Sequence, residues 1–309
     1  MPRTKKEITN WLDAKVEDKY SKKGELEHIL ELPDTQIGST EFEDYNFWIP
    51  EEDDNDDVAF SKKDIRFTPG LYKIIDEILV NAYDQTVRLK EIARQVINKE
   101  NPDEDDYIES GIDFVKNIKI DIDMEEGYIS VCNDGEGVDV DIHKVHKVYV
   151  PQLIFGDMRT SSNYNKKETG IKIVGGRNGF GAKLANIFST RFIVETVDGR
   201  RGKHFRQEYE KNMSKRHEPE VKNTTKKAFT RITFYPDLKR FGYDDGMDDS
   251  LYNLVLKRAY DLAACTEPNI NVYLNDEKID CKNFEKYVSY YLGDKKQYPR
   301  IYKQFNNRW

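Results

Sequence analysis

A glutamate, an asparagine and an aspartate recur at helical spacing between residues 69 and 98. Glu77, Asn81 and Asp84 occupy positions i, i+4 and i+7, which brings all three into one narrow stripe of a helix. A carboxylate and an amide one turn apart can polarise a water molecule and hold a divalent cation, as phosphoanhydride hydrolysis requires. Taken alone, the triplet more often indicates a polar stripe that faces solvent.

A second polar segment, residues 133–137, reads Asn-Asp-Gly-Glu-Gly and follows a run of strand-forming residues. Its two glycines allow the backbone to pass close to a flat ligand. A carboxylate there can accept a hydrogen bond from an exocyclic amine. The alternative is an Asx-type turn within a hairpin.

The third segment is a loop dense in glycine that runs into an apolar, helix-like stretch. Gly176, Gly179 and Gly181 form the pattern GxxGxG. Such a backbone exposes N–H groups to phosphate oxygens, and the N-terminus of a following helix adds partial positive charge. No Gly-Lys-Ser/Thr follows and the order is not GxGxxG, so the spacing excludes a P-loop and a dinucleotide-binding fingerprint.

The elements that must position these segments predict an α+β fold with a mixed, mostly antiparallel sheet and helices on one face. Apolar residues at helical spacing predict a long helix over residues 69–98. Alternating residues predict strands. The expected strands are 118–122, 128–132, 191–196, 204–207 and 230–234, with a short hairpin over 271–279 and further helices over 248–264 and 283–292. Two acidic runs, 51–57 and 100–106, predict solvated loops because like charges repel.

Composition narrows the class of protein. The 309 residues include 49 Lys and Arg against 57 Asp and Glu, a net charge of −8 that argues against a protein whose main task is to coat nucleic acid. No stretch resembles a membrane span or a signal peptide, so an intracellular location without a membrane partner is expected. Cys132, Cys265 and Cys281 lack CxxC spacing, so neither a disulfide framework nor a zinc site is indicated.

Together these segments resemble the GHKL superfamily of ATPases, whose ATP-binding (Bergerat) fold encloses the nucleotide over an antiparallel sheet. Residues 70–82, 149–156 and 176–183 closely resemble the ATPase region of eukaryotic-type type II DNA topoisomerases. Residues 26–30, 33–35 and 258–261 extend the resemblance over nearly the whole chain.

The resemblance implies a role for each matching residue. Glu77 matches the general base that activates the attacking water, and Asn81 matches the ligand that holds Mg²⁺. Asp134 occupies the position that reads adenine, and Thr230 lies near a water on the adenine side. Tyr20 belongs to an N-terminal arm that reaches the nucleotide of the partner subunit. The residues that match ribose, phosphate and lid contacts are Ser161, Ser162, Asn163, Gly176, Arg177, Asn178, Gly179, Phe180, Gly181, Ala182 and Lys183.

The resemblance also implies an organisation and a function. We expect residues 1–40 to form an arm for dimer exchange, 41–295 a GHKL ATPase domain, and 296–309 the start of a transducer region. The chain is then a fragment or a free-standing module without DNA-cleaving activity. Its expected role is an ATP-hydrolysing gate that dimerises on ATP binding and captures a DNA duplex without sequence specificity. A cellular protein of this kind would work in the nucleus, and a viral one in the host cytoplasm or nucleus.

Three alternatives remain open at this point. Chaperone, mismatch-repair and histidine-kinase domains of the superfamily share the short motifs only. A nucleotide-dependent clamp or DNA-binding scaffold would bind without hydrolysis, although Glu77 argues against a purely binding role. Finally, a basic district over residues 200–206, continued by Lys211, Lys215, Lys222, Lys226 and Lys227, could contact DNA phosphates or form a solvated hairpin.

Overall fold

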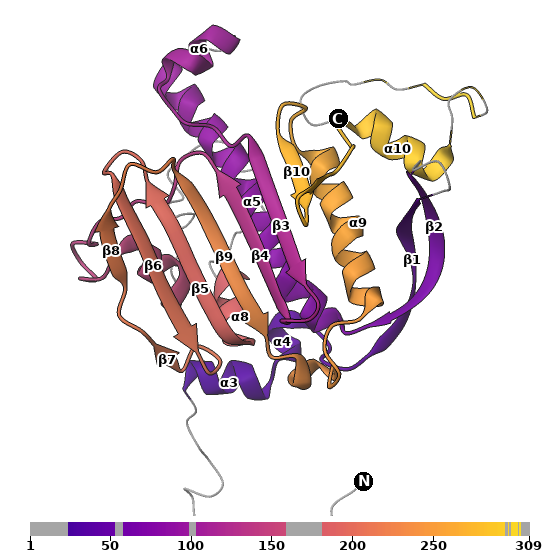
Figure 1. The fold of residues 1–309 in the computed structure, drawn as a ribbon, viewed down its shortest axis with the longest axis horizontal. Coiled ribbons are helices and arrows are strands. Elements are labelled where there is room, and N and C mark those ends of the chain that lie inside the picture. The colour runs from indigo at the N-terminus through magenta and orange to yellow at the C-terminus, as the bar shows by residue number, and fades with distance from the viewer. Residues whose placement is uncertain are drawn as a thin grey trace, which may run out of the picture.

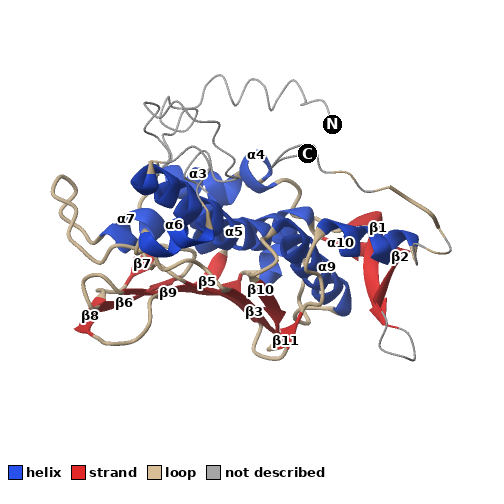
Figure 2. Cartoon of the chain, turned by 90° about the horizontal axis from the view of Figure 1, so that it is seen from above, coloured by secondary structure: helices blue, strands red, loops and turns tan. Residues whose placement is uncertain are grey.

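The structure, a computed structural model, describes residues 24–52, 58–98, 103–158, 181–293, 296, 298–301 and 303. A nine-stranded sheet forms one layer, and the helices lie on one of its faces (Figure 2). This arrangement confirms the predicted α+β class.

The sheet is antiparallel apart from one pair of strands. Its order is β11-β10-β3-β4-β9-β5-β6-β7, with β8 paired to β6 (Figure 1). The parallel pair is β10 with β3. The bounds are β3 (Asn117–Asp123), β4 (Tyr128–Asp134), β5 (Ser189–Asp198), β6 (Lys203–Glu210), β7 (Lys215–Arg216), β8 (Glu220–Asn223), β9 (Phe229–Pro236), β10 (Asn271–Leu274) and β11 (Glu277–Lys278). The predicted strands are therefore confirmed, and β7 and β8 are additional.

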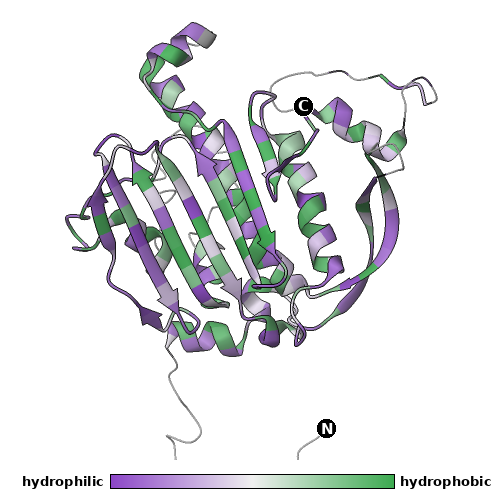
Figure 3. Ribbon diagram, viewed as in Figure 1, coloured by the Kyte–Doolittle hydropathy of each residue, from purple (hydrophilic) through white to green (hydrophobic). Residues whose placement is uncertain are grey.

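Side chains alternate between the two faces of the sheet, as the period of two requires. On β3, for example, Ile118, Ile120 and Ile122 are buried beneath the helices. Hydrophobic and hydrophilic bands accordingly follow one another along the central strands (Figure 3). On the open face Arg191 Nε lies 2.6 Å from Glu208 Oε1, so this face carries charged side chains in cross-strand pairs.

The long predicted helix is α5 (Pro69–Ile97). Proline stands at its first position, where the missing N–H costs no hydrogen bond, and Asn98 ends it in the left-handed conformation with φ of 53°. The residues that α5 buries include Leu71, Ile74, Ile75, Ile78 and Leu79. They recur at helical spacing and fix which side of α5 faces the core.

Further helices over the sheet are α7 (Val150–Gly156), α8 (Gly181–Ile187) and α9 (Asp249–Cys265). The helix α10 (Phe284–Leu292) packs against α9. The carboxylate of Asp248 accepts the Leu251 N–H at 2.8 Å and so caps α9. Asn283 caps α10 in the same way through the Lys286 N–H.

A separate two-stranded sheet, β1 (Glu43–Glu52) and β2 (Val58–Phe67), packs against α9 and α10. Ile49 and Phe60 supply buried contacts there. The sequence patterns did not predict this hairpin.

The prediction that both acidic runs are solvated loops is wrong for part of each run. Glu51 and Glu52 end β1, while residues 53–57 lie outside the described residues. In the second run α6 (Glu104–Glu109) begins with a capping box. Asp103 accepts the Asp106 N–H at 2.9 Å, and the Asp106 carboxylate accepts the Asp103 N–H at 3.1 Å. Reciprocal capping offsets the repulsion between the carboxylates.

The described part of the expected N-terminal arm contains α3 (Glu25–Glu31) and α4 (Asp34–Ile37). Ile29 and Ile37 are buried in the main core, so this segment packs on the domain. Residues 1–23 lie outside the described residues, and the exchange of the arm stays a prediction. Among the helices in the described ranges, none has the length and hydropathy to cross a membrane.

Candidate functional site

The site begins where α5 meets the first turn of α8. The Glu77 side chain is 19% exposed. A Cβ atom placed on Gly181 would overlap the Glu77 carboxylate, so the backbone of α8 touches that group directly. On the other side, Lys73 Nζ lies 2.5 Å from Glu77 Oε1. The carboxylate is therefore held between an ammonium group and the backbone of Gly181, at a position where a larger residue would displace it.

Asn81 lies one turn further along α5, and Gln85 one turn beyond it. Gln85 Nε2 donates a hydrogen bond of 3.0 Å to the carbonyl of Glu136, in the loop that follows β4. Steps of four residues keep Glu77, Asn81 and Gln85 on one side of the helix. Asn81 is therefore located between the start of α8 and the loop after β4.

Asp84 lies two turns after Glu77 on the same side of α5, as its spacing predicted, but it is buried there. Its side chain is only 2% exposed. Burial lowers the pKa of Arg88, one turn later, and the Asp84 carboxylate partly offsets that shift. Asp84 thus belongs to the interior of the domain, whereas Glu77 and Asn81 remain partly accessible.

The loop after β4 fits tightly against its neighbours. Gly135 has a φ of +84°, and a Cβ there would lie 2.7 Å from the Val115 nitrogen. A Cβ on Gly137 would overlap the Val197 carbonyl. Neither position has room for a side chain. The sequence predicted a close approach to a flat ligand, whereas this close approach is to protein backbone.

The Asp134 carboxylate is bound by donors at the start of β3. Its Oδ1 accepts the N–H groups of Lys116 at 2.6 Å and Asn117 at 2.8 Å, and its Oδ2 accepts Asn117 Nδ2 at 2.6 Å. Because residues alternate along β4, Asp134 lies on the open face of the sheet, away from α5. The carboxylate organises the start of β3 and does not point toward Glu77 and Asn81.

Asn133 is the strand-end residue on the helix-covered face. It is 5% exposed and follows the buried Ile129 and Val131 at the period of two. Its partner across the β4–β9 pair is Thr230. The sequence interpretation missed Asn133, although the strand's apolar alternation was visible and would have identified it.

Thr230 forms a small hydroxyl cluster with Thr196 of β5. Their Oγ1 atoms lie 3.0 Å apart, and the Val138 N–H donates to Thr196 Oγ1 at 3.0 Å. Thr196 is fully buried, and sequence patterns gave no sign of its role. Asn133, Thr230 and Thr196 consequently line one end of the sheet on the face that carries α5.

Lys183 of α8 is the buried cation of the site. Its side chain is 2% exposed, and burial lowers its pKa to about 8, an effect that the Asp157 carboxylate partly offsets. A buried ammonium gains from an incoming anion because the anion restores the charged form. This position suits a phosphate.

The described residues therefore bring together Glu77, Asn81 and the start of α8, where Ala182 packs against the core. Thr230 lies at the end of the sheet. The other predicted contacts fall outside the described residues; they are Tyr20, Ser161, Ser162, Asn163, Gly176, Arg177, Asn178, Gly179 and Phe180.

Several side chains of the basic district form ion pairs within the domain. Arg206 Nη2 lies 2.9 Å from Glu208, and Lys215 Nζ lies 2.5 Å from Glu210. Arg200 and Arg201 bind carboxylates of the loop after β4 and of β5. These pairs favour the solvated-hairpin interpretation over direct contact with DNA.

Comparison with known proteins places this geometry in a family. The chain is 42% identical over 296 residues to the probable DNA topoisomerase 2 of Dictyostelium discoideum, a match that covers 95% of this chain and 17% of that protein. It is 45% identical over 287 residues to the DNA topoisomerase 2 of Acanthamoeba polyphaga mimivirus, covering 93% of this chain and 20% of the relative. The chain thus spans about a fifth of the length of these curated relatives.

Among solved structures, the ATPase region of Saccharomyces cerevisiae topoisomerase II superposes with a TM-score of 0.81 and 40% identity. That match covers 95% of this chain and 70% of the yeast chain. No model of a known protein family matches the sequence. Identity, coverage and fold agree, and the chain belongs to the type II DNA topoisomerase family, in the part that corresponds to its ATPase region.

Proposed function

We propose that this chain binds and hydrolyses ATP as the N-terminal gate module of a type II DNA topoisomerase. The observation that carries the proposal is the contact between the Glu77 carboxylate and the Gly181 backbone at the start of α8. This contact supports the proposal because it would hold Glu77, the expected general base, against the end of the predicted phosphate-binding loop. Phosphoryl transfer is achieved mainly by positioning and charge neutralisation, so this arrangement suits the reaction.

Each residue has a part in this proposal. Glu77 accepts a proton from the attacking water, and Asn81 offers an amide oxygen of the kind that Mg²⁺ prefers. When bound, Mg²⁺ neutralises charge on the phosphates. Lys183 compensates further phosphate charge. Asn133, in place of Asp134, faces the adenine ring of ATP, beside Thr230.

The output of the module follows from its family. ATP binds the closed dimer more tightly than the open monomer, which is the condition for nucleotide to drive closure. The arm that contains Tyr20 crosses to the partner subunit's nucleotide, and the closed dimer encloses a DNA duplex without reading its sequence. The site of action is the nucleus for a cellular protein, and the host cytoplasm or nucleus for a viral one.

One experiment separates this proposal from a clamp that binds without hydrolysis. Phosphate release from ATP is followed for the chain with Mg²⁺ and again after its removal with EDTA, alongside equilibrium binding of a non-hydrolysable ATP analogue. We expect slow turnover that stops without Mg²⁺. Binding without turnover under both conditions would favour the clamp, and absence of binding would exclude both.

Lys183→Met should weaken nucleotide binding and abolish the fall in affinity that the parent chain shows at alkaline pH. Phosphates raise the pKa of Lys183 from its value of about 8 in the free protein, so binding takes up a proton above pH 8. Affinity should be full below pH 8 and then fall by up to about tenfold per pH unit until the pKa of the complex is reached. Titrations of the analogue from pH 7 to 10 test this, and an equal slope in the variant would contradict it.

Asp134→Ala should lower stability more than it lowers nucleotide affinity. The substitution leaves three N–H groups near the start of β3 without their acceptor, at a cost of about 1–3 kcal/mol in the free energy of unfolding. Urea denaturation measures the loss. Asn133→Ala is the matched comparison, for which affinity should change more than for Asp134→Ala. A larger loss of affinity for Asp134→Ala than for Asn133→Ala would instead indicate that Asp134 contacts the nucleotide.

A further inference from the structure

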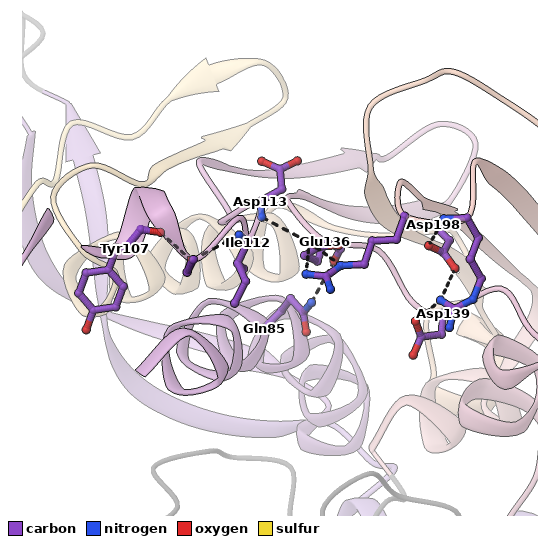
Figure 4. A network of polar contacts seen from close by, with 10 residues as sticks. Gln85, Tyr107, Ile112, Asp113, Glu136, Asp139 and Asp198 are labelled. Carbon is purple, nitrogen blue, oxygen red and sulfur yellow. Dashed lines mark hydrogen bonds and ion pairs between the residues drawn. The ribbon is translucent and has the colours of Figure 1, made fainter. Parts of the chain in front are cut away.

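Glu136 lies between the two glycines of the loop after β4, within a network of polar contacts (Figure 4). It forms an ion pair with Arg200 of the β5–β6 turn. Arg200 Nη2 and Nε lie 2.8 and 3.0 Å from Glu136 Oε1. The two side chains differ in exposure, at 60% for Arg200 and 15% for Glu136. The carboxylate is therefore mostly withdrawn from water and depends on donors from the protein.

Glu136 is also held from two other elements. Its N–H donates to the Asp113 carbonyl at 2.8 Å, and its carbonyl accepts Gln85 Nε2 at 3.0 Å. The Asp113 N–H points toward Oε1 at 3.4 Å. One residue thus joins α5, the segment before β3 and the β5–β6 turn, and the two flanking glycines have no side chains with which to hold the loop.

The same turn fastens the loop at a second point. Asp198, 3% exposed, accepts the Val140 N–H at 2.8 Å, and Arg201 Nη1 lies 2.9 Å from Asp198 Oδ2 and 2.5 Å from Asp139 Oδ1. Two arginines that looked like a DNA-binding patch in the sequence therefore hold the strand-end loop from one side.

We propose that Arg200 is a positioning residue that fixes the glycine loop through Glu136 and thereby sets the affinity of the site for nucleotide. The inference rests on the proposed function, because the loop borders the end of the sheet that carries Asn133 and Thr230. An exposed ion pair contributes little by itself, but removing one partner from a mostly buried carboxylate costs more. When Arg200 is replaced, we expect the glycine loop to relax so that the Glu136 carboxylate becomes exposed to water.

The effect should fall on binding and spare the chemical step. Glu77 lies two turns from Gln85 along α5, and its own contacts are to Lys73 and Gly181. Arg200 touches neither of these groups. A purely structural role would instead lower thermal stability or reduce all parameters together.

The test compares dissociation constants for a fluorescent non-hydrolysable ATP analogue with kcat and KM for ATP. The variants are Arg200→Gln, Arg200→Lys, Arg200→Glu and the exchange Glu136→Arg with Arg200→Glu. Arg191→Gln is the matched control, because Arg191 pairs with Glu208, 16% exposed, on the open face of the same sheet. Thermal unfolding of each variant verifies folding.

We expect Arg200→Gln to raise Kd and KM about three- to tenfold while kcat at saturation stays within about twofold. Arg200→Glu should be weaker still, and Arg200→Lys and the charge exchange should recover most of the affinity. Arg191→Gln should bind like the parent chain. Equal Kd for Arg200→Gln and Arg191→Gln, or a fall in kcat with unchanged Kd, would overturn the inference. Absence of binding by the parent chain would overturn the proposed function and this inference with it.

Discussion

Glu77→Gln should reduce the turnover of ATP by about a hundredfold or more while leaving nucleotide affinity nearly unchanged. The amide is close in size to the carboxylate and still fits against Gly181, but it cannot accept the proton of the attacking water. Phosphate release at saturating ATP and equilibrium binding of the analogue measure the two quantities separately.

The control for this variant is a substitution that neutralises the neighbouring carboxylate, Asp76→Asn. Asp76 precedes Glu77 on α5 and accepts Arg258 Nε at 2.6 Å, outside the contact with α8. Asp76→Asn therefore changes charge by the same amount next to the site. Equal losses of turnover in the two variants would argue that net charge matters and that Glu77 is not the base.

Gly181→Ala should abolish most turnover at little cost in stability. The added methyl group overlaps the Glu77 carboxylate, the far end of a flexible side chain that can rotate away. Rotation restores packing, but it moves the base from its position. Misplacement of a catalytic group by about 1 Å can cost about a hundredfold in rate, and we expect a loss of that size.

Measurement of kcat beside the midpoint of urea unfolding tests this separation of activity from stability. Gly24→Ala is the matched control, since a Cβ there meets nothing within 4 Å and the position lies far from α8 in sequence. A large fall in stability with proportionate loss of turnover would mean that α8, and not Glu77, moves to make room.

The spacing of apolar residues predicted those helices and strands that bury one side in the core and leave the other side polar. The helix of residues 69–98 was recognisable because Leu71, Ile74 and Ile78 repeat at helical spacing, and β3 because its isoleucines alternate. Helical spacing likewise predicted that Glu77 and Asn81 share one side of α5.

Contacts between distant segments could not be predicted from patterns. Glu136 and Arg200 are 64 residues apart, and only the finished sheet brings them together. The β1–β2 hairpin was missed because β1 does not alternate regularly between buried and exposed residues and ends in an acidic run. The side of β4 on which Asp134 lies could not be predicted from motif spacing, although the alternation with Val131 would have supplied it.

The parallel pair of β10 with β3 has a consequence for the order of assembly. Asn271 lies beside Asn117, so this edge cannot form during synthesis until the chain has grown past residue 274. The antiparallel strands β3, β4, β9, β5 and β6 are complete by residue 236. Because loop closure across a long separation is entropically unfavourable, we expect the β3 edge to stay open until late in folding and to be the place where a nascent chain is most exposed to strand pairing with another molecule.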